Sequence, residues 1–421
     1  MIHRFKLTFI TTLLLATVLN AQKILVPMEE TQTDHLKAYG VAFWMLEHGE
    51  NVEWLLNYRG GSFLMNAGME LTRELRLRGV SFENVPAGGE VGIYSTIDQN
   101  NMDVVLLEKA PKIGVYTPPD KAPWDDAVTL ALTYAEINYD KLWDADVLDG
   151  KLADYDWLHL HHEDFTGQYG KFYRNYSRTA WYQEQQRQYE AFATSRGFKS
   201  VALEKKAVAR NINRYVEDGG FLFAMCSATD ALDIAIAAYG VDIVDQVYDH
   251  SPVDPNAQSK LDFSKTLAFT NFHLITDPYI YEYSDIDYPP STQPRATSAE
   301  ADYFTLFEFS AKWDPVPTML TQDHVSAVKG FMGQTTGFKR ELIKKHVIIL
   351  GDVPGGEQVK YLHGNAGKGT FTFLGGHDPE DYQHFVGDPP TQLSLHRNSP
   401  GYRLILNNVL FPAAKKKERK T

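Results

Sequence analysis

Strand-like and helix-like segments alternate along most of this 421-residue chain. Such alternation is typical of α/β proteins, in which helices connect neighbouring parallel strands. The clearest case is the stretch 219–238, where an apolar run ends at Cys226 and an apolar pattern with helical spacing follows. We therefore predict an α/β fold with a doubly wound, mostly parallel sheet, which binds ligands beyond the carboxyl ends of its strands.

The order of these segments predicts two units. Residues 22–110 are expected to form a small N-terminal α/β region, and residues 111–412 a larger domain. Two stretches, near 165–200 and 277–317, are rich in polar and aromatic residues and are expected to be inserted covers or linkers. Strands are expected at 23–28, 52–57, 102–107, 112–116, 155–160, 221–225, 346–350 and 370–374. Helices are expected at 34–48, 70–78, 125–137, 202–215, 231–238 and from 400 to just before 412.

The two ends of the chain look different from the rest. Residues 1–21 have the pattern of a signal peptide, with Arg4 and Lys6 before the apolar stretch 7–18. This stretch is too short to span a bilayer, so we expect cleavage and export to the periplasm or the exterior, with no membrane span. Residues 413–421 are expected to form a basic, solvated tail.

The charge and cysteine content narrow the classes of partner. The net charge is −13 at pH 7, which disfavours nucleic acid and anionic lipid as partners. The aromatic content of 13% includes residues able to stack on sugars, so the expected ligand is a small molecule or a carbohydrate. One cysteine is present, so no disulfide within the chain is expected and the thiol is either silent or reactive. No protein partner is indicated.

Cys226 is the first candidate for a catalytic residue. A sharp turn from strand to helix presents a nucleophile at the edge of a sheet, and the small residues Ala224 and Ala228 let such a turn close. The amino end of the following helix is expected to lower the pKa of the thiol. The alternative is that Cys226 is a small buried hydrophobic residue.

A second segment follows the strand expected at 370–374. His377 is the candidate base for Cys226, and Glu380 or Asp378 is the candidate group that orients it. Gly375 and Gly376 would let the backbone approach a substrate closely. The alternatives are an ordinary glycine turn and a helix start at Asp378.

A histidine-rich segment ends the strand expected at 155–160. On a strand, His159 and His161 would share one face, and His162 would lie on the other. His161, His162 and Glu163 are candidates for contact with substrate, together with Gly375, Gly376 and Asp378 of the second segment. The three imidazoles are also metal-ligand types, but their spacing matches no closed structural zinc motif. We therefore expect no cofactor, with a divalent metal at His159, His161 and His162 as the alternative.

The motifs around Cys226, His377 and Glu380 resemble those of the class I glutamine amidotransferase-like superfamily. There, a cysteine in a Gly-x-Cys-x-Gly turn pairs with a later His-x-Glu motif. Here Ala224 and Ala228 stand at the glycine positions, and the acid is three residues after the histidine. The resemblance implies a flavodoxin-like fold and a Cys226–His377–Glu380 triad.

Two further resemblances concern longer stretches. Residues 155–162 and 367–380 are similar to the trehalose-utilisation branch of that superfamily, which generally lacks the cysteine and is linked to sugar metabolism. Over its whole length, and especially at 38–40, 55–63 and 157–164, the chain resembles exported Bacteroidota proteins often labelled asparagine synthetase B. The chain lacks the N-terminal cysteine and the Ser-Gly-Gly-x-Asp-Ser loop of a glutamine-dependent asparagine synthetase.

These observations lead to three functional hypotheses. The first is an exported hydrolase or transferase that acts on an amide or acyl group through Cys226. The second is a sugar-related enzyme or carbohydrate-binding protein that uses the histidine segment, with or without a metal. The third is a catalytically inactive binding protein.

Overall fold

The computed structural model describes residues 22–119, 126–293, 302–308, 310–314, 316, 325–381 and 389–414. The predicted signal peptide, the tail from 415 onward and part of the predicted insert 277–317 lie outside these residues.

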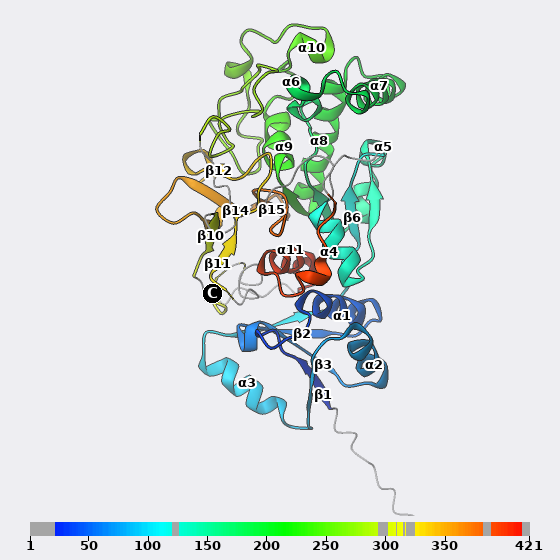
Figure 1. Cartoon of the computed structure of the whole chain (residues 1–421), viewed down its shortest axis with the longest axis vertical. Helices are drawn as coiled ribbons and strands as arrows, with labels where there is room; N and C mark the ends of the chain where they lie inside the picture. Colours follow the sequence, from blue (N-terminus) through cyan, green and yellow to red (C-terminus); the bar gives the residue numbers. More distant parts are fainter. Residues whose placement is uncertain are drawn as a thin grey trace, which may run out of the picture.

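The first sheet is antiparallel and lies in the lower part of Figure 1. Its strands, in the order β4-β1-β3-β2-β5, are β1 (Lys23–Val26), β2 (Val52–Leu56), β3 (Ser62–Asn66), β4 (Glu83–Val85) and β5 (Asp103–Leu107). Each neighbouring pair is antiparallel. The predicted boundary between residues 110 and 111 therefore falls between the last strand of this sheet and the first strand of the next.

The second sheet is larger and mixed. Its strands are β6 (Ile113–Tyr116), β7 (Asp140–Leu142), β8 (Trp157–Leu160), β9 (Phe221–Met225), β10 (Tyr303–Leu306), β11 (Ala327–Lys329), β12 (Phe338–Lys339), β13 (Ile348–Asp352), β14 (Gln358–Ala366) and β15 (Gly369–Leu374). Five neighbours, in the order β7-β6-β8-β9-β15, run parallel. Beyond β15 the order β14-β13-β10-β11 is antiparallel, and β12 pairs with β14. The chain is thus α/β, but the expectation of a mostly parallel sheet holds for only half of this sheet.

Helices pack on both faces of the parallel strands (Figure 1). The α-helices are α1 (His35–Glu47), α2 (Met69–Arg78), α3 (Glu90–Gln99), α4 (Ala127–Ala135), α5 (Asp144–Leu148), α6 (Tyr173–Tyr176), α7 (Ala180–Ser195), α8 (Val201–Asp218), α9 (Ser227–Ala237), α10 (Gln246–Asp249) and α11 (Pro400–Leu410). The alternation of strand β9 shows why both faces are covered. Phe221 and Phe223 join the core that contains α4 and α11, whereas Leu222 and Ala224 join the core that contains α8 and α9.

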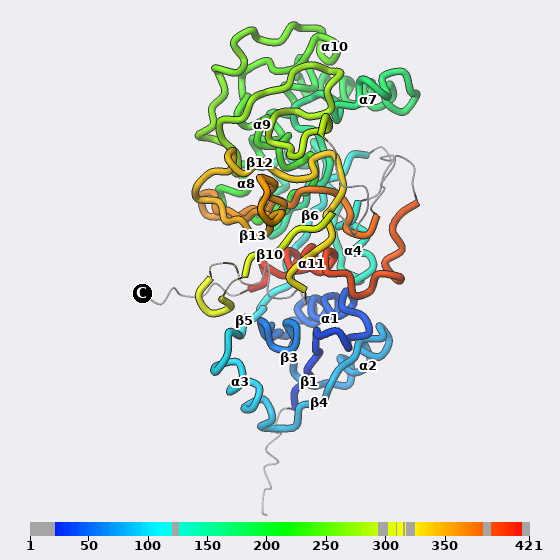
Figure 2. Tube along the Cα trace, turned by 60° about the vertical axis from the view of Figure 1, so that its left-hand side comes forward, coloured from blue at the N-terminus to red at the C-terminus, as the bar shows by residue number. Residues whose placement is uncertain are grey.

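The two sheets are connected through a shared helical layer. Figures 1 and 2 both show α1 beside α4 and α11, and residues of all three helices belong to one buried core. The crossing of α1 over α4 requires a residue without a side chain at Gly40, because a Cβ atom there would lie 1.8 Å from the carbonyl oxygen of Ala135. The first sheet is therefore fixed against the larger unit by close packing.

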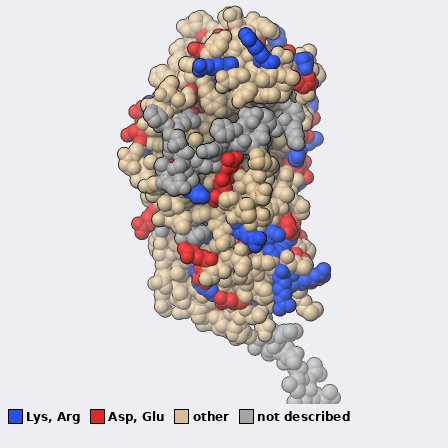
Figure 3. All heavy atoms as spheres, in the orientation of Figure 1, with Lys and Arg blue, Asp and Glu red and all other residues tan. Residues whose placement is uncertain are grey.

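The surface of the described residues is of mixed character. None of the described helices has the length and apolar character needed to cross a membrane. On the face shown in Figure 3, basic and acidic side chains are interspersed among uncharged ones. This face therefore lacks the extended field of one sign that attracts polyanions.

One buried histidine in the large sheet predicts a pH dependence of stability. His363 in β14 is 1% exposed, its Nδ1 lies 2.9 Å from Thr372 Oγ1, and burial lowers its pKa to about 3. The unfolded chain, with a histidine pKa of about 6.5, binds this proton first, so stability falls as the pH decreases from about 6.5 toward 3. Between about pH 8 and pH 5, we expect this residue to remove about 2 kcal/mol from the free energy of unfolding.

The variant His363→Gln keeps a hydrogen-bonding side chain and removes the titration. Chemical denaturation at the two pH values should show a loss about 2 kcal/mol smaller in this variant than in the parent protein. His273→Gln is the matched control, because the side chain of His273 is 75% exposed. Equal losses in the parent protein and in His363→Gln would contradict the assignment.

Candidate functional site

The parallel strands bring the predicted segments to one edge of the large sheet. His161 and His162 follow β8, Cys226 follows β9, and His377 lies three residues beyond the end of β15. These strands are parallel neighbours in the order β8-β9-β15, so their carboxyl ends meet at the same edge. The sequence-based expectation of converging segments therefore agrees with the strand pairing.

The backbone at Cys226 forms a strained turn between strand and helix. Cys226 directly precedes α9 and has φ 51° and ψ −140°, a conformation that residues with a side chain rarely adopt. Its N–H donates to the carbonyl oxygen of Leu374, and the N–H of Ala228 donates to that of His161. The turn is thus connected to the ends of both neighbouring strands. Such strain persists only where the surroundings enforce it, and it is frequent at functional sites.

The thiol itself is buried, and its surroundings raise its pKa. Cys226 is 2% exposed, and the N–H of Gln334 donates to its Sγ at 3.3 Å. Burial raises the pKa of the thiol to about 11, although the backbone N–H groups of Thr335, Gln334 and Ser227 act in the opposite direction. The prediction that the helix end lowers this pKa is wrong, because desolvation of the thiolate outweighs the favourable dipoles.

Three imidazoles form a compact group next to this turn. The ring centroids of His161 and His377 are 4.2 Å apart, those of His161 and His162 are 4.9 Å apart, and those of His162 and His377 are 5.8 Å apart. One nitrogen from each ring lies within 4.8 Å of the other two. We call His161, His162 and His377 the histidine cluster. His161 and His377 are buried, whereas His162 is half-buried and gives the cluster its more exposed side.

The position of His162 corrects an expectation from the sequence. Strand alternation would place it on the face opposite His161, but β8 ends at Leu160. Beyond that residue the alternation no longer applies. Both rings therefore approach His377.

A carboxylate lies behind the cluster. Asp126 Oδ1 is 3.0 Å from His161 Nδ1 and 3.5 Å from His159 Nε2. The same carboxylate caps α4 by accepting the N–H groups of Val128 and Thr129. Burial alone would raise the pKa of Asp126, but the two histidines outweigh burial and hold the pKa well below its usual value. Asp126 therefore supplies a fixed negative charge beside His161.

His159 belongs to the second layer of this arrangement. Its ring is buried against those of Trp157 and Phe223, and its Nδ1 lies 3.0 Å from the carbonyl oxygen of Phe223. His159, His161 and Asp126 also form a group with metal-ligand types. In this group, Asp126 Oδ1 faces a ring nitrogen of both histidines.

The two candidate orienting acids have other partners. Glu380 Oε2 lies 3.0 Å from His396 Nδ1 and 3.1 Å from Lys329 Nζ. Asp378 Oδ2 accepts hydrogen bonds from the hydroxyl groups of Tyr402 and Thr391, and Asp378 Oδ1 accepts the N–H of Glu380. Burial raises the pKa of Asp378. These contacts give both acids a structural role near the start of the segment that follows β15.

The remaining candidates also make internal contacts. Glu163 Oε2 accepts the backbone N–H of His161 at 2.7 Å, and burial raises the pKa of Glu163 to about 8. Cβ atoms added at Gly375 and Gly376 would lie 2.7 Å from the carbonyl oxygen of Thr336 and 1.8 Å from that of Phe331. The two glycines therefore permit close packing of the segment 331–337, in addition to any role toward a substrate.

Two groups of functional interest were not found from the sequence. Asp126 lies at the amino end of the helix predicted at 125–137, and its signal was the helix-capping position next to a strand end. Gln334 and its neighbours come from a loop more than a hundred residues after Cys226, and no sequence pattern indicated that they cover the thiol. Long-range loop packing of this kind leaves no local periodicity.

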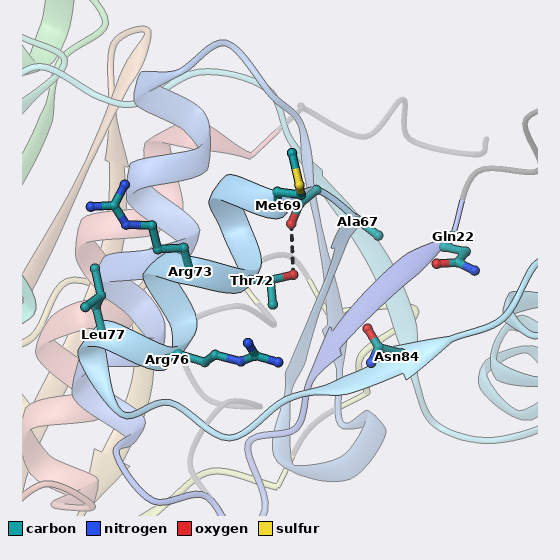
Figure 4. Close-up of a pocket in the computed structure, with 9 residues that line it drawn as sticks. Gln22, Ala67, Met69, Thr72, Arg73, Arg76, Leu77 and Asn84 are labelled. Atoms are coloured by element: carbon teal, nitrogen blue, oxygen red, sulfur yellow. Dashed lines mark hydrogen bonds between the residues drawn. The ribbon is translucent and has the colours of Figure 1, made fainter.

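Two surface hollows lie away from the histidine cluster. A hollow of about 670 Å³ on the first sheet is lined by residues of α2 and β4, and Figure 4 shows the side chain of Arg76 extending toward the strand that carries Asn84. A cavity of about 1830 Å³ is lined by Phe221 and Gly369, the first residues of β9 and β15. It therefore lies at the opposite edge of the sheet from Cys226. Neither lining includes a residue of the histidine cluster.

Comparison with known proteins gives little guidance. No protein-family model matches the chain, and no curated protein matches it. Among solved structures, it is similar to a cytoplasmic protein of Salmonella typhimurium, with 10% identity, a TM-score of 0.34, and coverage of 73% of this chain and 100% of that protein. A second cytoplasmic protein, from strain LT2 of Salmonella typhimurium, has 13% identity, a TM-score of 0.33, and coverage of 72% and 100%. The GH42 beta-galactosidase Gan42B has 8% identity, a TM-score of 0.27, and coverage of 66% and 29%.

Proposed function

We propose that the chain is an exported hydrolase that cleaves an amide or ester bond of a small molecule at the histidine cluster. The observation that carries the proposal is the meeting of three imidazoles, from two parallel strand ends, beside a fixed carboxylate. Imidazole is the side chain best suited to move protons near neutral pH. The strand order of the parallel half, 2-1-3-4-5 in chain order, supports a flavodoxin-like, doubly wound assignment within the class I glutamine amidotransferase-like superfamily.

The position of the cluster also supports the proposal. In the order β7-β6-β8-β9-β15, the direction of strand succession reverses between β6 and β8. Ligands of open α/β sheets bind outside the carboxyl ends of strands at such a reversal. Asp126 follows β6 at the amino end of α4, and His161 follows β8, so the pair belongs to this location.

The chemistry follows from these positions. The cluster holds and activates a water molecule, whose oxygen attacks the carbonyl carbon of the substrate. The bond from that carbon to the leaving nitrogen or oxygen then breaks, and the proton taken from water passes to the leaving group. The Asp126 carboxylate compensates the positive charge that develops at His161, since it lies 3.0 Å from Nδ1.

A cysteine-dependent mechanism is the second candidate, and one observation favours it. The backbone of Cys226 has the strained geometry with which a nucleophile is displayed between strand and helix. The raised pKa of the thiol opposes this role, because a nucleophilic cysteine must form a thiolate. Attack by water at the histidine cluster therefore agrees better with the electrostatics.

A panel of nitrophenyl esters, nitroanilides and nitrophenyl glycosides distinguishes these candidates. We expect hydrolysis of an ester or amide, and we expect His377→Ala to lower kcat/KM at least about 100-fold, as for loss of a group that takes part in proton transfer. Cys226→Ser should keep kcat/KM within about fivefold of the parent value, as a change of packing without a change of mechanism.

Control variants separate the loss of His377 from a general effect of substitution. His273→Ala removes an exposed imidazole and should leave kcat/KM unchanged. Circular dichroism spectra confirm that each variant is folded. A loss in Cys226→Ser as large as in His377→Ala would favour the cysteine mechanism. Cleavage of glycosides alone would instead support the sugar-related hypothesis.

A further inference from the structure

The histidine cluster has the donor set of a transition-metal site. Its three rings each offer one nitrogen, and these nitrogens lie within 4.8 Å of one another. In a tetrahedral zinc site with nitrogen ligands at about 2.0–2.1 Å, the nitrogens are about 3.3 Å apart. Small rotations of the rings would therefore bring the three nitrogens to coordination distance.

One ring nitrogen of the histidine cluster is buried without a hydrogen-bond partner among the described residues, and a bound cation would supply one. His161 is fully buried, and its Nε2 has no hydrogen-bond partner among the described residues. A buried polar atom without a partner costs free energy, and a bound ion is one way in which native proteins satisfy such an atom. Because Nδ1 of the same ring faces Asp126, Nε2 is the nitrogen directed away from that carboxylate and available to a ligand.

Asp126 has the position of an outer carboxylate in a metal site. Metal-binding histidines usually donate their second ring N–H to a carboxylate, which fixes the tautomer and the ring orientation. The 3.0 Å separation of Asp126 Oδ1 and His161 Nδ1 places a carboxylate in this position. Capping of α4 by the same carboxylate holds it in place. The negative charge also offsets the charge of a cation next to three neutral rings.

The second group of metal-ligand types, Asp126, His159 and His161, fits a metal less well. His159 Nδ1 faces the carbonyl oxygen of Phe223, and its ring is enclosed by aromatic residues. Asp126 is the half-buried member of that group, and its Oδ1 already faces a ring nitrogen of each of the two fully buried histidines. The metal set expected from the sequence, with His159, is therefore replaced by a set with His377.

We propose that His161, His162 and His377 bind one divalent transition-metal ion of the zinc class, with Asp126 as the outer carboxylate of His161. Three imidazole ligands with one more exposed side match sites that keep a coordination position for water or substrate. The proposal deepens the proposed function, since it names the cofactor with which the histidine cluster would act. It rests on the proposed function only for the role of the bound metal in hydrolysis. Metal binding itself is measured separately.

Metal titration of the chelator-treated protein tests the proposal. Isothermal calorimetry with Zn²⁺, and visible absorption with Co²⁺, should show one ion per chain with a Kd of about 1 μM or lower. His162→Gln and His377→Ala should each weaken binding at least about 100-fold. Asp126→Asn should weaken it about 10- to 100-fold, as for loss of an outer carboxylate.

His273→Ala removes an exposed imidazole and should leave the Kd unchanged. His162→Gln alters a half-buried side chain. This variant is therefore expected to fold even if variants of the buried histidines do not, and it keeps the test available. Absence of binding, or binding that is unaffected by His162→Gln and His377→Ala, would overturn the proposal. Hydrolysis by metal-free protein that also binds no Zn²⁺ would leave the proposed function standing and reject the metal, whereas metal binding without hydrolysis of any substrate in the panel would do the reverse.

Discussion

Iodoacetamide is expected to alkylate Cys226 in the native protein at least about 100-fold more slowly than it alkylates free cysteine near pH 8. With a pKa of about 11, this thiol forms about 200-fold less thiolate at that pH than a free thiol with a pKa of about 8.5. A thiolate whose thiol has a higher pKa is more nucleophilic, and this recovers about tenfold of the loss in rate. The thiol is also only 2% exposed, which limits access of the reagent. Because the chain has one cysteine, the rate of adduct formation measured by mass spectrometry reports this residue alone.

The unfolded protein provides the control for this measurement. In concentrated guanidinium chloride the thiol should react at the rate of free cysteine, since burial and the contact with Gln334 are lost. Fast alkylation of the native protein below neutral pH, with a marked decrease in His377→Ala, would contradict the expectation. That result would indicate a thiolate activated by histidine and would favour the cysteine mechanism over the histidine cluster.

The elements with clear periodicity could be predicted from the sequence. The strand before Cys226, the helix after it and the last helix are present as β9, α9 and α11, with shifts of a few residues at their ends. Their apolar patterns are strong because each is buried in one large core. The strand expected at 346–350 is also present, as β13, shifted by two residues.

Other elements could not be predicted, because their signals are weak or depend on distant partners. Strands β3 and β4 and helix α3 lie in the first unit, where β4 has a single buried residue, Val85. Strand β14 runs next to β15 through a turn at 367–368, and its many polar residues mask its burial. The antiparallel half of the large sheet follows from such pairings, which no alternation of strands and helices specifies.

The candidate site was predictable in position and less so in chemistry. His161, His162, Cys226 and His377 were placed at one edge because parallel strands share a carboxyl edge. Which groups touch within that edge depends on side-chain packing beyond the strand ends. There the sequence favoured a pair of Cys226 and His377. In the structure, His377 packs against His161, and the N–H of Gln334 donates to the thiol of Cys226. A Cβ atom on Gly333 would lie close to both Cys226 Sγ and the backbone nitrogen of His377, so the pairing stays a prediction.

Substitution of Gly376 by alanine is expected to destabilise the fold by about 3 kcal/mol, because a strained backbone conformation adds to overpacking. Gly376 has φ +94°, and a Cβ atom there would lie 1.8 Å from the carbonyl oxygen of Phe331. The N–H of Gly376 donates to Thr335, and the N–H of the following His377 donates to Met332. The clash would therefore separate these two segments and displace His377 from the histidine cluster.

Gly355→Ala is the matched control, since Gly355 also has a positive φ of 71° but has open space around its Cβ position. This control should cost about 1 kcal/mol and leave the cluster intact, because only backbone strain is added. Chemical denaturation gives the two free energies of unfolding, and Zn²⁺ titration of the folded variants reports the cluster. If Gly376→Ala cost no more than Gly355→Ala, the packing of Phe331 over Gly376 would not be what positions His377. A large cost with unchanged metal affinity would show that His377 reaches the cluster independently of this contact.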